Sequence, residues 1–459
     1  MKASGVVLSC LLLLGCSGSS DEPEPSSGPI WKSGVVFPTA SAPGARGYLD
    51  RRGLVHAHSV YSHDACDGEP RDANDAVNAP CLADFRHGVC TTEHDFVMLS
   101  DHKESYARTE YPDVLLYDAS AGDALVEHDG LPTANRMACP DGRTPLIMAG
   151  TETATMPVGL EHHVSTDVTE REAVYGDVSQ ESMQKLKAAG GLVLAQHTED
   201  WTVDQLADLP FDGFEMYNLH ANLIIGAGAA IGLVAKLKTP EELPHPDLIL
   251  LPIISEDARY VDKWGTVLSR GVHRITTVGT DCHQNVFQDE LPDGERIDSY
   301  RRMMQWFSNH VLVKPQADGS WDDRDLKAGL SAGRAYGAFE VLGYPVGFDY
   351  VALSSGETSE MGSEVPVGSE LRITAPRVQG LDPKADKPEI VVRLLRAVES
   401  GWELMDEGSK SLAFQTTEPG AYRAEVRIRP RHLLAQLSSY AELAEKSFVW
   451  IYSNPIYVK

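Results

Sequence analysis

Five short apolar runs of this chain are each followed by residue types that bind metal ions. They lead into His56-Ala57-His58, Asp101-His102, Glu152, Gln196-His197 and Asp281-Cys282-His283. Imidazole nitrogens combined with a few carboxylate oxygens suit zinc, manganese or iron, whereas calcium takes mostly oxygen ligands. The residue types therefore predict a site for divalent metal ions.

The spacing within two of these endings supports the same chemistry. His56 and His58 are two residues apart, as are Asp281 and His283. Side chains at positions i and i+2 of an extended segment share a face, so each pair can meet one ion. Cys282 should then point away from the site.

The surrounding segments indicate how these residues are brought together. From residue 55 to about residue 350, strand-like runs alternate with helical stretches, which predicts a parallel sheet or an α/β barrel. Residues 179–189 and 298–312 show helical spacing of apolar residues. Residues 104–145 show no clear period, and we expect a long loop that overhangs the site. In a barrel, the strand ends would deliver all five endings to one rim.

In residues 351–459 the runs are mainly strand-like. This pattern predicts a β-rich C-terminal domain, a small sandwich without a catalytic cluster. The expected strands are 371–374, 390–395, 421–428 and 448–452, with a helix at 433–444. In residues 422–428 apolar and polar side chains alternate strictly, as in a half-buried strand.

The first residues predict a lipoprotein signal peptide over 1–16. An apolar stretch too short to span a bilayer ends in the lipobox Leu13-Leu14-Gly15-Cys16. Cys16 would carry the lipid, and residues 17–45 would form a flexible tether. Ser17 after the cysteine favours the outer membrane of a bacterial envelope, facing the periplasm or the surface. The alternative is an ordinary secretory signal with a chance cysteine.

The net charge of −27 argues against a general binder of nucleic acid or anionic membranes. Its simplest explanation is solubility. In an oxidising envelope, Cys66, Cys81, Cys90 and Cys139 should form disulfides. Three pairings are possible, and we favour Cys66–Cys81 with Cys90–Cys139.

The sequences GLVHAHSVYSHDA, FVMLSDH, IMAGTE, LAQH and GTDCH resemble, in order, the motifs of the PHP (polymerase and histidinol phosphatase) superfamily. The resemblance covers about residues 50–345. It implies a distorted (β/α)7 TIM-like barrel, the PHP fold, which we place at residues 46–350. It also implies up to three metal ions.

Carried over residue by residue, the resemblance implies a set of ligands. The first metal would be bound by His56, His58, Glu152 and Asp281; the second by Asp64, His102 and His283; the third by His163, His197 and Glu152. His162 is the alternative to His163. Thr198 stands where the family often has proline, which leaves the pocket wall there undefined.

This ligand set implies a phosphoesterase. Three divalent ions carry about +6 and the three carboxylates about −3, so an acidic protein would hold a small phosphoester at a local charge of about +3. A metal-activated water would attack phosphorus in line. Candidates for the catalytic groups are Asp101, Glu199, His63 and His220. The alternative role for Asp101 is to orient a ligand.

Three other functions remain open from the sequence. They are hydrolysis of a C–N or C–O bond, a non-catalytic metal-binding surface lipoprotein, and a nuclease, which the negative charge disfavours. Glu215 would either line the pocket or make a local hydrogen bond. Solvent-facing or capping roles are expected for His87, His94, His128, His245, His273 and His310.

Overall fold

The structure, a computed structural model, describes residues 44–73, 76–219, 221–222, 226, 228, 232–233, 236–237, 239–381 and 383–459. The predicted signal peptide, nearly all of the predicted tether, and His220 lie outside the described residues. Within the described part of the chain, no helix has the length and apolar character needed to cross a membrane.

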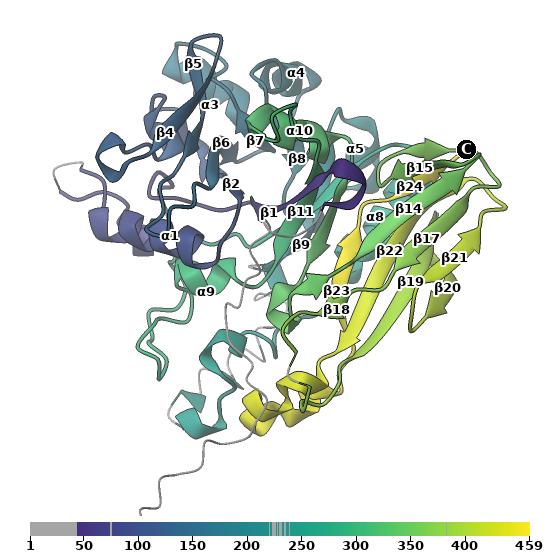
Figure 1. The fold of residues 1–459 in the computed structure, drawn as a ribbon. Coiled ribbons are helices and arrows are strands. Elements are labelled where there is room, and N and C mark those ends of the chain that lie inside the picture. The colour runs from purple at the N-terminus through teal and green to yellow at the C-terminus, as the bar shows by residue number, and fades with distance from the viewer. Residues whose placement is uncertain are drawn as a thin grey trace, which may run out of the picture.

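The first part of the chain is a mixed α/β arrangement around a large, mostly parallel central sheet (Figure 1). Its strands are β1 (Leu49–Val55), β2 (Phe96–Met98), β3 (Asp101–His102), β4 (Ala124–His128), β5 (Leu131–Arg136), β6 (Leu146–Glu152), β7 (Met156–Leu160), β8 (Leu192–Ala195), β9 (Gly213–Asn218), β10 (Ile275–Gly279), β11 (Ser308–Val313) and β12 (Ala335–Ala338). Its α-helices are α1 (Ala79–Thr91), α2 (Lys103–Tyr106), α3 (Val168–Tyr175), α4 (Gln180–Ala188), α5 (Val203–Asp208), α8 (Ala258–Ser269), α9 (Tyr300–Met304) and α10 (Asp323–Ser331). Short 3₁₀ helices are η2 (Ala45–Gly47), η3 (Cys66–Gly68), η4 (Asp113–Leu115), η5 (Ala119–Ala121), η6 (Thr198–Asp200), η7 (Pro240–Glu242), η8 (Pro246–Leu248) and η9 (Glu340–Leu342).

Seven strands follow one another through neighbouring pairings in the order β1, β2, β6, β7, β8, β9 and β10. Only β7 in this series runs antiparallel to its neighbours. Just beyond the two end strands, Ala57 and Cys282 form a parallel bridge, and the amide of His58 donates to Cys282 O at 3.1 Å. The carboxyl ends of β1, β2, β6, β8, β9 and β10 therefore lie at one edge of the sheet.

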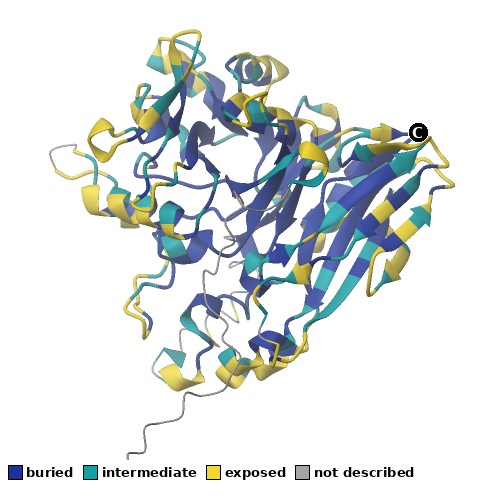
Figure 2. Cartoon of the chain, in the orientation of Figure 1, coloured by how far each residue is buried: buried dark blue, intermediate teal, exposed yellow. Residues whose placement is uncertain are grey.

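Residues after 344 form mainly antiparallel sheet, which confirms the predicted change to β structure. The strands are β13 (Pro345–Val346), β14 (Asp349–Ser354), β15 (Glu357–Glu360), β16 (Glu364–Val365), β17 (Glu370–Thr374), β18 (Arg377–Val378), β19 (Glu389–Val398), β20 (Gly401–Gly408), β21 (Leu412–Gln415), β22 (Gly420–Arg429), β23 (Phe448–Ser453) and β24 (Ile456–Val458). All four strands expected there are present. Strand β23 also pairs with β12, so the sheet continues from the first part of the chain. Figure 2 shows exposed and buried residues alternating along the outer strands, whereas the central strands are buried throughout.

Helix α8 joins the C-terminal sheet to the first part of the chain. The indole of Trp402 donates to Val261 O at 2.8 Å. Gly265 lies so close to the C-terminal strands that a Cβ there would sit 2.0 Å from Gly401 O. The buried Arg423 guanidinium stacks on the rings of Trp264 and Trp402, at 4.7 and 4.5 Å. Such cation–π contacts stabilise this junction.

The prediction of a helix at 179–189 is confirmed by α4. The Ser179 hydroxyl accepts from Ser182 N as the N-cap, and Gly190 follows the helix with a φ of 88°. The prediction of a helix over 298–312 is wrong beyond residue 304. Ser308–Val313 is instead strand β11, because it pairs with β1 on one side and β12 on the other. Tertiary pairing there outweighs the helical spacing.

Two further expectations need correction. Residues 104–145 contain the hairpin β4–β5, with Asp129-Gly130 at its turn, and β5 pairs with β6 at the sheet. The segment is therefore not one structureless loop. The helix expected at 433–444 is two 3₁₀ helices, η10 (Arg431–Gln436) and η11 (Ser438–Ala444).

Two of the histidines assigned to the surface are buried. His310 lies between Asp50 and Glu340, at 2.9 and 3.1 Å, and Glu340 also pairs with the buried Arg52. His94 is bonded to the Thr92 hydroxyl at 2.7 Å. Both belong to a buried polar network beneath β1 and β11, where paired charges replace water.

The two disulfides are Cys66–Cys81 and Cys90–Cys139, which confirms the pairing favoured from the sequence. Cys282 is free and buried. The first bond ties the loop that follows β1 to the first turn of α1. That loop is held again where Cys66 N donates to His283 O at 3.0 Å. Cys66, two residues after Asp64, is therefore anchored both by a disulfide and by a backbone hydrogen bond.

Candidate metal centre

The residues predicted to bind metal lie where strands end. His56 follows β1, His102 ends β3, and Glu152 ends β6. His197 comes two residues after β8, and Asp281 two residues after β10. Because these strand ends share one edge of the sheet, side chains far apart in the sequence meet there.

The first group of potential ligands is His56, His58, Glu152 and Asp281. Their ligand atoms lie within 4.8 Å of one another, and all four side chains are buried. Glu152 Oε2 is 3.2 Å from His56 Nε2 and 3.1 Å from His58 Nε2. Asp281 Oδ1 approaches the same two nitrogens at 3.1 and 3.3 Å. Two imidazoles and two carboxylates thus converge on one point.

The second group is His58, Asp64, His102 and His283, and its ligand atoms also lie within 4.8 Å of one another. Asp64 Oδ2 is 3.3 Å from both His102 Nε2 and His283 Nε2. The rings of His58 and His283 are stacked at 3.7 Å. His58 therefore belongs to both groups, and two ions bound there would be neighbours.

Glu152 also faces a third position. Its other oxygen, Oε1, lies 3.0 Å from His197 Nε2, and Asp281 Oδ2 is 3.7 Å from the same nitrogen. Glu152 thus presents one oxygen to His56 and His58 and the other to His197, the geometry of a bridging carboxylate. Described protein atoms supply fewer ligands here than in the two groups above.

The donor set fits a divalent transition metal. His58 Nε2 is buried and has no hydrogen-bond partner among the described residues, although two carboxylate oxygens face it. Mixed imidazole and carboxylate donors are typical of zinc, manganese and iron sites. The arrangement supports metal binding without fixing the identity or number of the ions.

A layer of buried carboxylates orients these ligands. Glu215 on β9 is fully buried, and its Oε1 accepts from His56 Nδ1 at 2.8 Å, which turns Nε2 toward the cluster. Asn218 donates to Glu215 Oε2 and to Asp281 Oδ2, at 3.0 and 3.3 Å. Gly279 is needed beside them, because a Cβ there would lie 1.7 Å from Glu215 Oε1. Glu215 does not line the cavity, and beyond its local bond to Asn218 it holds His56 from a distant part of the chain, a role that neither sequence-based interpretation gave it.

Asp101 acts on the backbone next to a ligand. Its two oxygens accept from Ser59 N and Ser59 Oγ, at 2.6 and 2.7 Å, so it fixes the turn that follows His58. Burial raises the pKa of Asp101. Asp101 is therefore a positioning residue, as one sequence-based interpretation proposed.

The carboxylates hold protons on the neighbouring imidazoles. Burial alone would lower the pKa of His197, but Glu152 and Glu199 raise it to about 11. Likewise, Asp64 outweighs burial and raises the pKa of His102 to about 9. In turn, the histidines outweigh burial and hold the pKa of Glu152 well below its usual range. A metal ion must displace such protons, so binding should release them.

Three of the ligand positions have an unusual backbone. His56, His197 and Asp281 have φ values of 81°, 44° and 53°, in the left-handed region that non-glycine residues seldom adopt. Such conformations cost on the order of 1–3 kcal/mol each and persist where a site requires them. All three lie within two residues of the end of a strand, where the chain turns to present a ligand.

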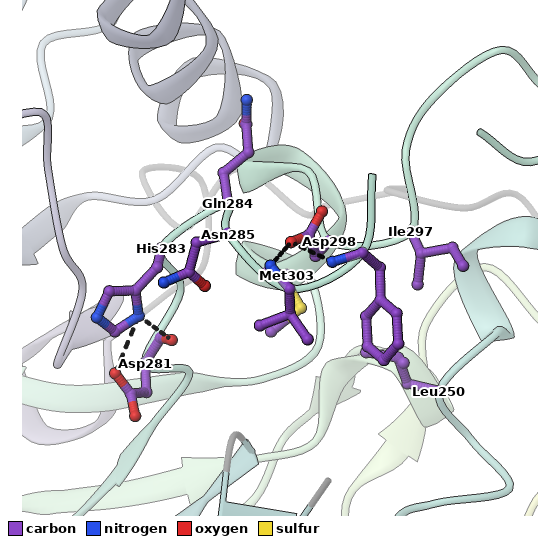
Figure 3. Close-up of a pocket in the computed structure, with 10 residues that line it drawn as sticks. Leu250, Asp281, His283, Gln284, Asn285, Ile297, Asp298 and Met303 are labelled. Carbon is purple, nitrogen blue, oxygen red and sulfur yellow. Dashed lines mark hydrogen bonds and ion pairs between the residues drawn. The ribbon is translucent and has the colours of Figure 1, made fainter. Parts of the chain in front are cut away.

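The cluster opens into a cavity of about 570 Å³. Its lining includes Asp64, His102, Glu152, His197, Asp281 and His283, and further Thr153, Ala154, Val178, Gln196, Asp200, Trp201, Gln205 and Ala221. No residue of 104–145 is among this lining, so the expected overhanging loop is wrong in that respect as well. Figure 3 shows His283 turned toward Asp281, beside a second, small pocket formed with Asn285, Asp298 and Met303. Asp298 holds that loop by accepting from the amides of residues 286 and 287, at 2.7 and 3.0 Å.

Two predicted site residues contact the cluster only at its edge. Glu199 lies 3.7 Å from His197 Nδ1 and accepts from the Tyr260 hydroxyl. The contacts with His197 and Tyr260 outweigh burial and lower the pKa of Glu199, so it stays ionised beside His197. His63 is exposed and lies beside His102, with ring centroids 5.0 Å apart and the ring planes tilted by 49°. His220 lies outside the described residues.

His163 is not brought to the cluster. Its Nδ1 lies 2.9 Å from the Tyr175 hydroxyl and its Nε2 2.8 Å from Thr109 O. It lines a different cavity together with His162. The prediction of His163 as a ligand is therefore not supported, because hydrogen bonds already occupy both ring nitrogens.

Sequence reasoning missed some residues that shape the site. Asn218 and Tyr260 act on Asp281 and Glu199, and Lys263 binds the loop after β8. Strand β9 ends at Asn218, so its position alone could have indicated that residue. Thr198, which replaces the expected proline, donates its hydroxyl to Glu215 O and ties the same loop to β9.

A separate group, His128, Asp322 and Asp323, also brings three potential ligands together. His128 Nε2 is 2.8 Å from Asp323 Oδ1, while Asp322 caps α10 by accepting from two backbone amides. Lys327 lies 3.9 Å from Asp323. The group is accounted for by ion pairing between the β4–β5 hairpin and α10.

Comparison of the chain with protein-family models, with curated proteins and with solved structures finds no match.

Proposed function

We propose that this protein is a metal-dependent phosphoesterase of the PHP type. The observation that carries the proposal is the pair of ligand groups that share His58 and open into one cavity. Two or more divalent ions held side by side are a common arrangement for phosphoester hydrolysis. The ordered sequence motifs support the same reading.

The charge of the site supports an anionic substrate. Among the ligands themselves, Asp64, Glu152 and Asp281 contribute about −3 and two divalent ions would contribute about +4, so the ions with their direct ligands would carry about +1; a third ion at His197 would raise this to about +3. A phosphate group would then be attracted to the cluster even though the whole chain is acidic. Metal ions bound here would supply positive charge and a water of lowered pKa.

The residues of the chain would hold and orient these components. Glu215 and Asp101 keep His56 and the turn after His58 in place. Glu199, ionised and bonded to Tyr260, keeps the ring of His197 turned toward Glu152. His63, exposed beside His102, is the described candidate for giving a proton to the leaving oxygen, because it lies at the edge of the cluster without being one of its ligands.

The strand pairings support a distorted seven-stranded barrel as the scaffold. The series from β1 to β10 returns on itself through the bridge between Ala57 and Cys282. A barrel in which one strand runs antiparallel would explain why ligands from five strand ends meet at a single rim.

The two disulfides support the proposed location. Disulfides persist in oxidising compartments such as the bacterial envelope, and both bonds lie in the part of the chain that carries the metal ligands. We infer that the chain acts outside the cytoplasm, attached through Cys16.

The test uses the full-length chain purified in detergent. Bound metal is measured first, and hydrolysis of p-nitrophenyl phosphate and bis-(p-nitrophenyl) phosphate is then assayed with manganese, zinc and iron. We expect turnover that a chelator abolishes and added metal restores. Bound metal without turnover on either ester would favour a binding protein, and turnover only on amide or lactone substrates would favour C–N or C–O hydrolysis.

The matched variants are His58→Gln and His87→Gln. His58 belongs to both ligand groups, whereas His87 is exposed on α1, where its ring lies within hydrogen-bond distance of the Thr91 hydroxyl. Activity should fall at least about a hundredfold in the first variant, because loss of a shared ligand affects both ions. Equal activity in the two variants would show that the cluster is not the site.

A further inference from the structure

One wall of the cavity is built by the segment that follows β8. Gln196, His197, Asp200 and Trp201 all line the cavity. His197 faces the metal ligands, whereas Asp200 is exposed and Trp201 is partly buried. This wall thus runs outward from the cluster and would meet the leaving group of a bound phosphoester.

The wall is held rigidly. The Lys263 ammonium on α8 donates to the carbonyls of residues 198, 199 and 201, at 2.7, 3.0 and 2.6 Å. The indole of Trp201 donates to Gln196 O at 2.9 Å and packs edge-on against Phe211 at 5.0 Å. Because α8 is itself fixed against the C-terminal sheet, Asp200 and Trp201 are presented in a preformed arrangement.

Three features of the wall favour a cation that carries N–H groups. Asp200 provides an exposed carboxylate and Trp201 an aromatic ring, and both attract an ammonium group. Gln196 is 5% exposed, and its amide nitrogen donates to Thr153 O at 2.8 Å. Its Oε1 has no hydrogen-bond partner among the described residues, so it can accept from an N–H donor.

The charges nearby point the same way. Among the described residues that line the cavity there is no lysine or arginine. Lys263 contacts the wall, but its ammonium is committed to three carbonyls. A second anionic group on the substrate would therefore meet Asp200 without a compensating cation from the described wall.

We propose that the substrate is a phosphoester of an alcohol bearing a primary ammonium group, of the ethanolamine phosphate class. The proposal rests on the phosphoesterase function argued above. In the reaction, water oxygen forms a bond to phosphorus, the bond from phosphorus to the ester oxygen breaks, and a proton from water ends on the released amino alcohol. The phosphate would lie at the ligand cluster and the ammonium group against Gln196, Asp200 and Trp201.

A binding experiment tests this without turnover. The metal-loaded protein is titrated calorimetrically with 2-aminoethylphosphonate and with propylphosphonate, which have the same chain length and differ in the ammonium group. We expect the aminoethyl compound to bind about fivefold to tenfold more tightly, the range for one exposed cation–π contact together with one exposed ion pair. Equal affinities would overturn the proposal.

The matched variants are Asp200→Asn and Asp204→Asn. Both remove one exposed carboxylate from the same short segment, but Asp204 pairs with Arg270 and does not line the cavity. Asp200→Asn should reduce the preference for the ammonium compound by about threefold to fivefold, and Asp204→Asn should leave it unchanged. An undiminished preference in Asp200→Asn would contradict the assignment of the wall.

Substrate assays then separate the possible sources of the ester. The kcat/KM values are compared for ethanolamine phosphate, choline phosphate, glycerol phosphate and phosphoglycerate, and for vesicles of phosphatidylethanolamine. We expect kcat/KM to decrease in the order ethanolamine phosphate, choline phosphate, glycerol phosphate, phosphoglycerate. Choline phosphate lacks N–H groups, and phosphoglycerate adds a second anionic group. Turnover in vesicles alone would assign the ester to a lipid headgroup, while a preference for phosphoglycerate would overturn the proposal. Absence of any phosphoester hydrolysis would instead refute the proposed function.

Discussion

Replacing Glu215 with glutamine should weaken metal binding without disturbing the fold. The substitution keeps the shape of a fully buried side chain but removes the charge that accepts from His56 Nδ1 at 2.8 Å. In the wild-type protein the amide of Asn218 donates to Glu215 Oε2. The substitution places a second amide group opposite that donor. Loss of such a partner typically reduces metal affinity about 10-fold to 100-fold, or about 1.4–2.8 kcal/mol.

The assay is a competition titration of metal against a chromogenic chelator, with circular dichroism to verify the fold. The loss should appear at the ion bound by His56, so any ion held by Asp64, His102 and His283 should keep its affinity. Glu161→Gln is the control, because Glu161 is a partly buried carboxylate that pairs with Arg324 and Lys327 instead. Wild-type affinity in Glu215→Gln would refute the view that this carboxylate orients His56.

Three further predictions concern stability and the second ligand group. Replacing the bonded pair Cys66 and Cys81 with serine should cost about 3 kcal/mol of unfolding free energy for a sequence separation of 15, and should lower metal stoichiometry at Asp64 more than at Glu152. Equal loss of both ions by elemental analysis would contradict the role given to that loop. His310 should stabilise the protein below its ordinary pKa of 6.5 and lose this contribution as the pH rises through about 9, because Asp50 and Glu340 outweigh burial and raise its pKa. The contribution is on the order of 3 kcal/mol, measured by urea unfolding at pH 6 and pH 10, and His310→Gln should flatten the difference. Chelation should lower the melting temperature, since an ion present at about 1,000 times its Kd stabilises by about 4 kcal/mol, and an unchanged melting temperature would count against a metal site.

The ligands could be predicted from the sequence because each follows a buried apolar run. In the structure, His56, Glu152 and Asp281 all come at or just beyond strands that share one edge. Asp64 lies in a loop and was found only through the family motifs, yet it reaches His102 and His283. Local pattern and motif order were sufficient for these positions.

Other features depend on tertiary contacts that no local pattern reveals. His163 follows the Glu152 motif, where the family resemblance places a ligand of the third metal. In the structure, hydrogen bonds to Tyr175 and Thr109 hold its ring away from the ligand cluster. The helical spacing of apolar residues predicts a helix that continues to residue 312. Residues 308–313 instead form strand β11, because they pair with two other strands. The role of Glu215 depends on the close approach of Gly279 from the neighbouring strand.

The most direct test of the metal centre is the metal content of the purified chain and of His58→Gln, measured by mass spectrometry after dialysis. His58 is the residue common to both ligand groups, and its Nε2 faces Glu152 and Asp281. We predict that the wild-type chain retains divalent ions at two or more per molecule and that the variant retains fewer than one. Equal metal content in the two proteins, or none in the wild type after incubation with zinc, manganese and iron, would contradict the account.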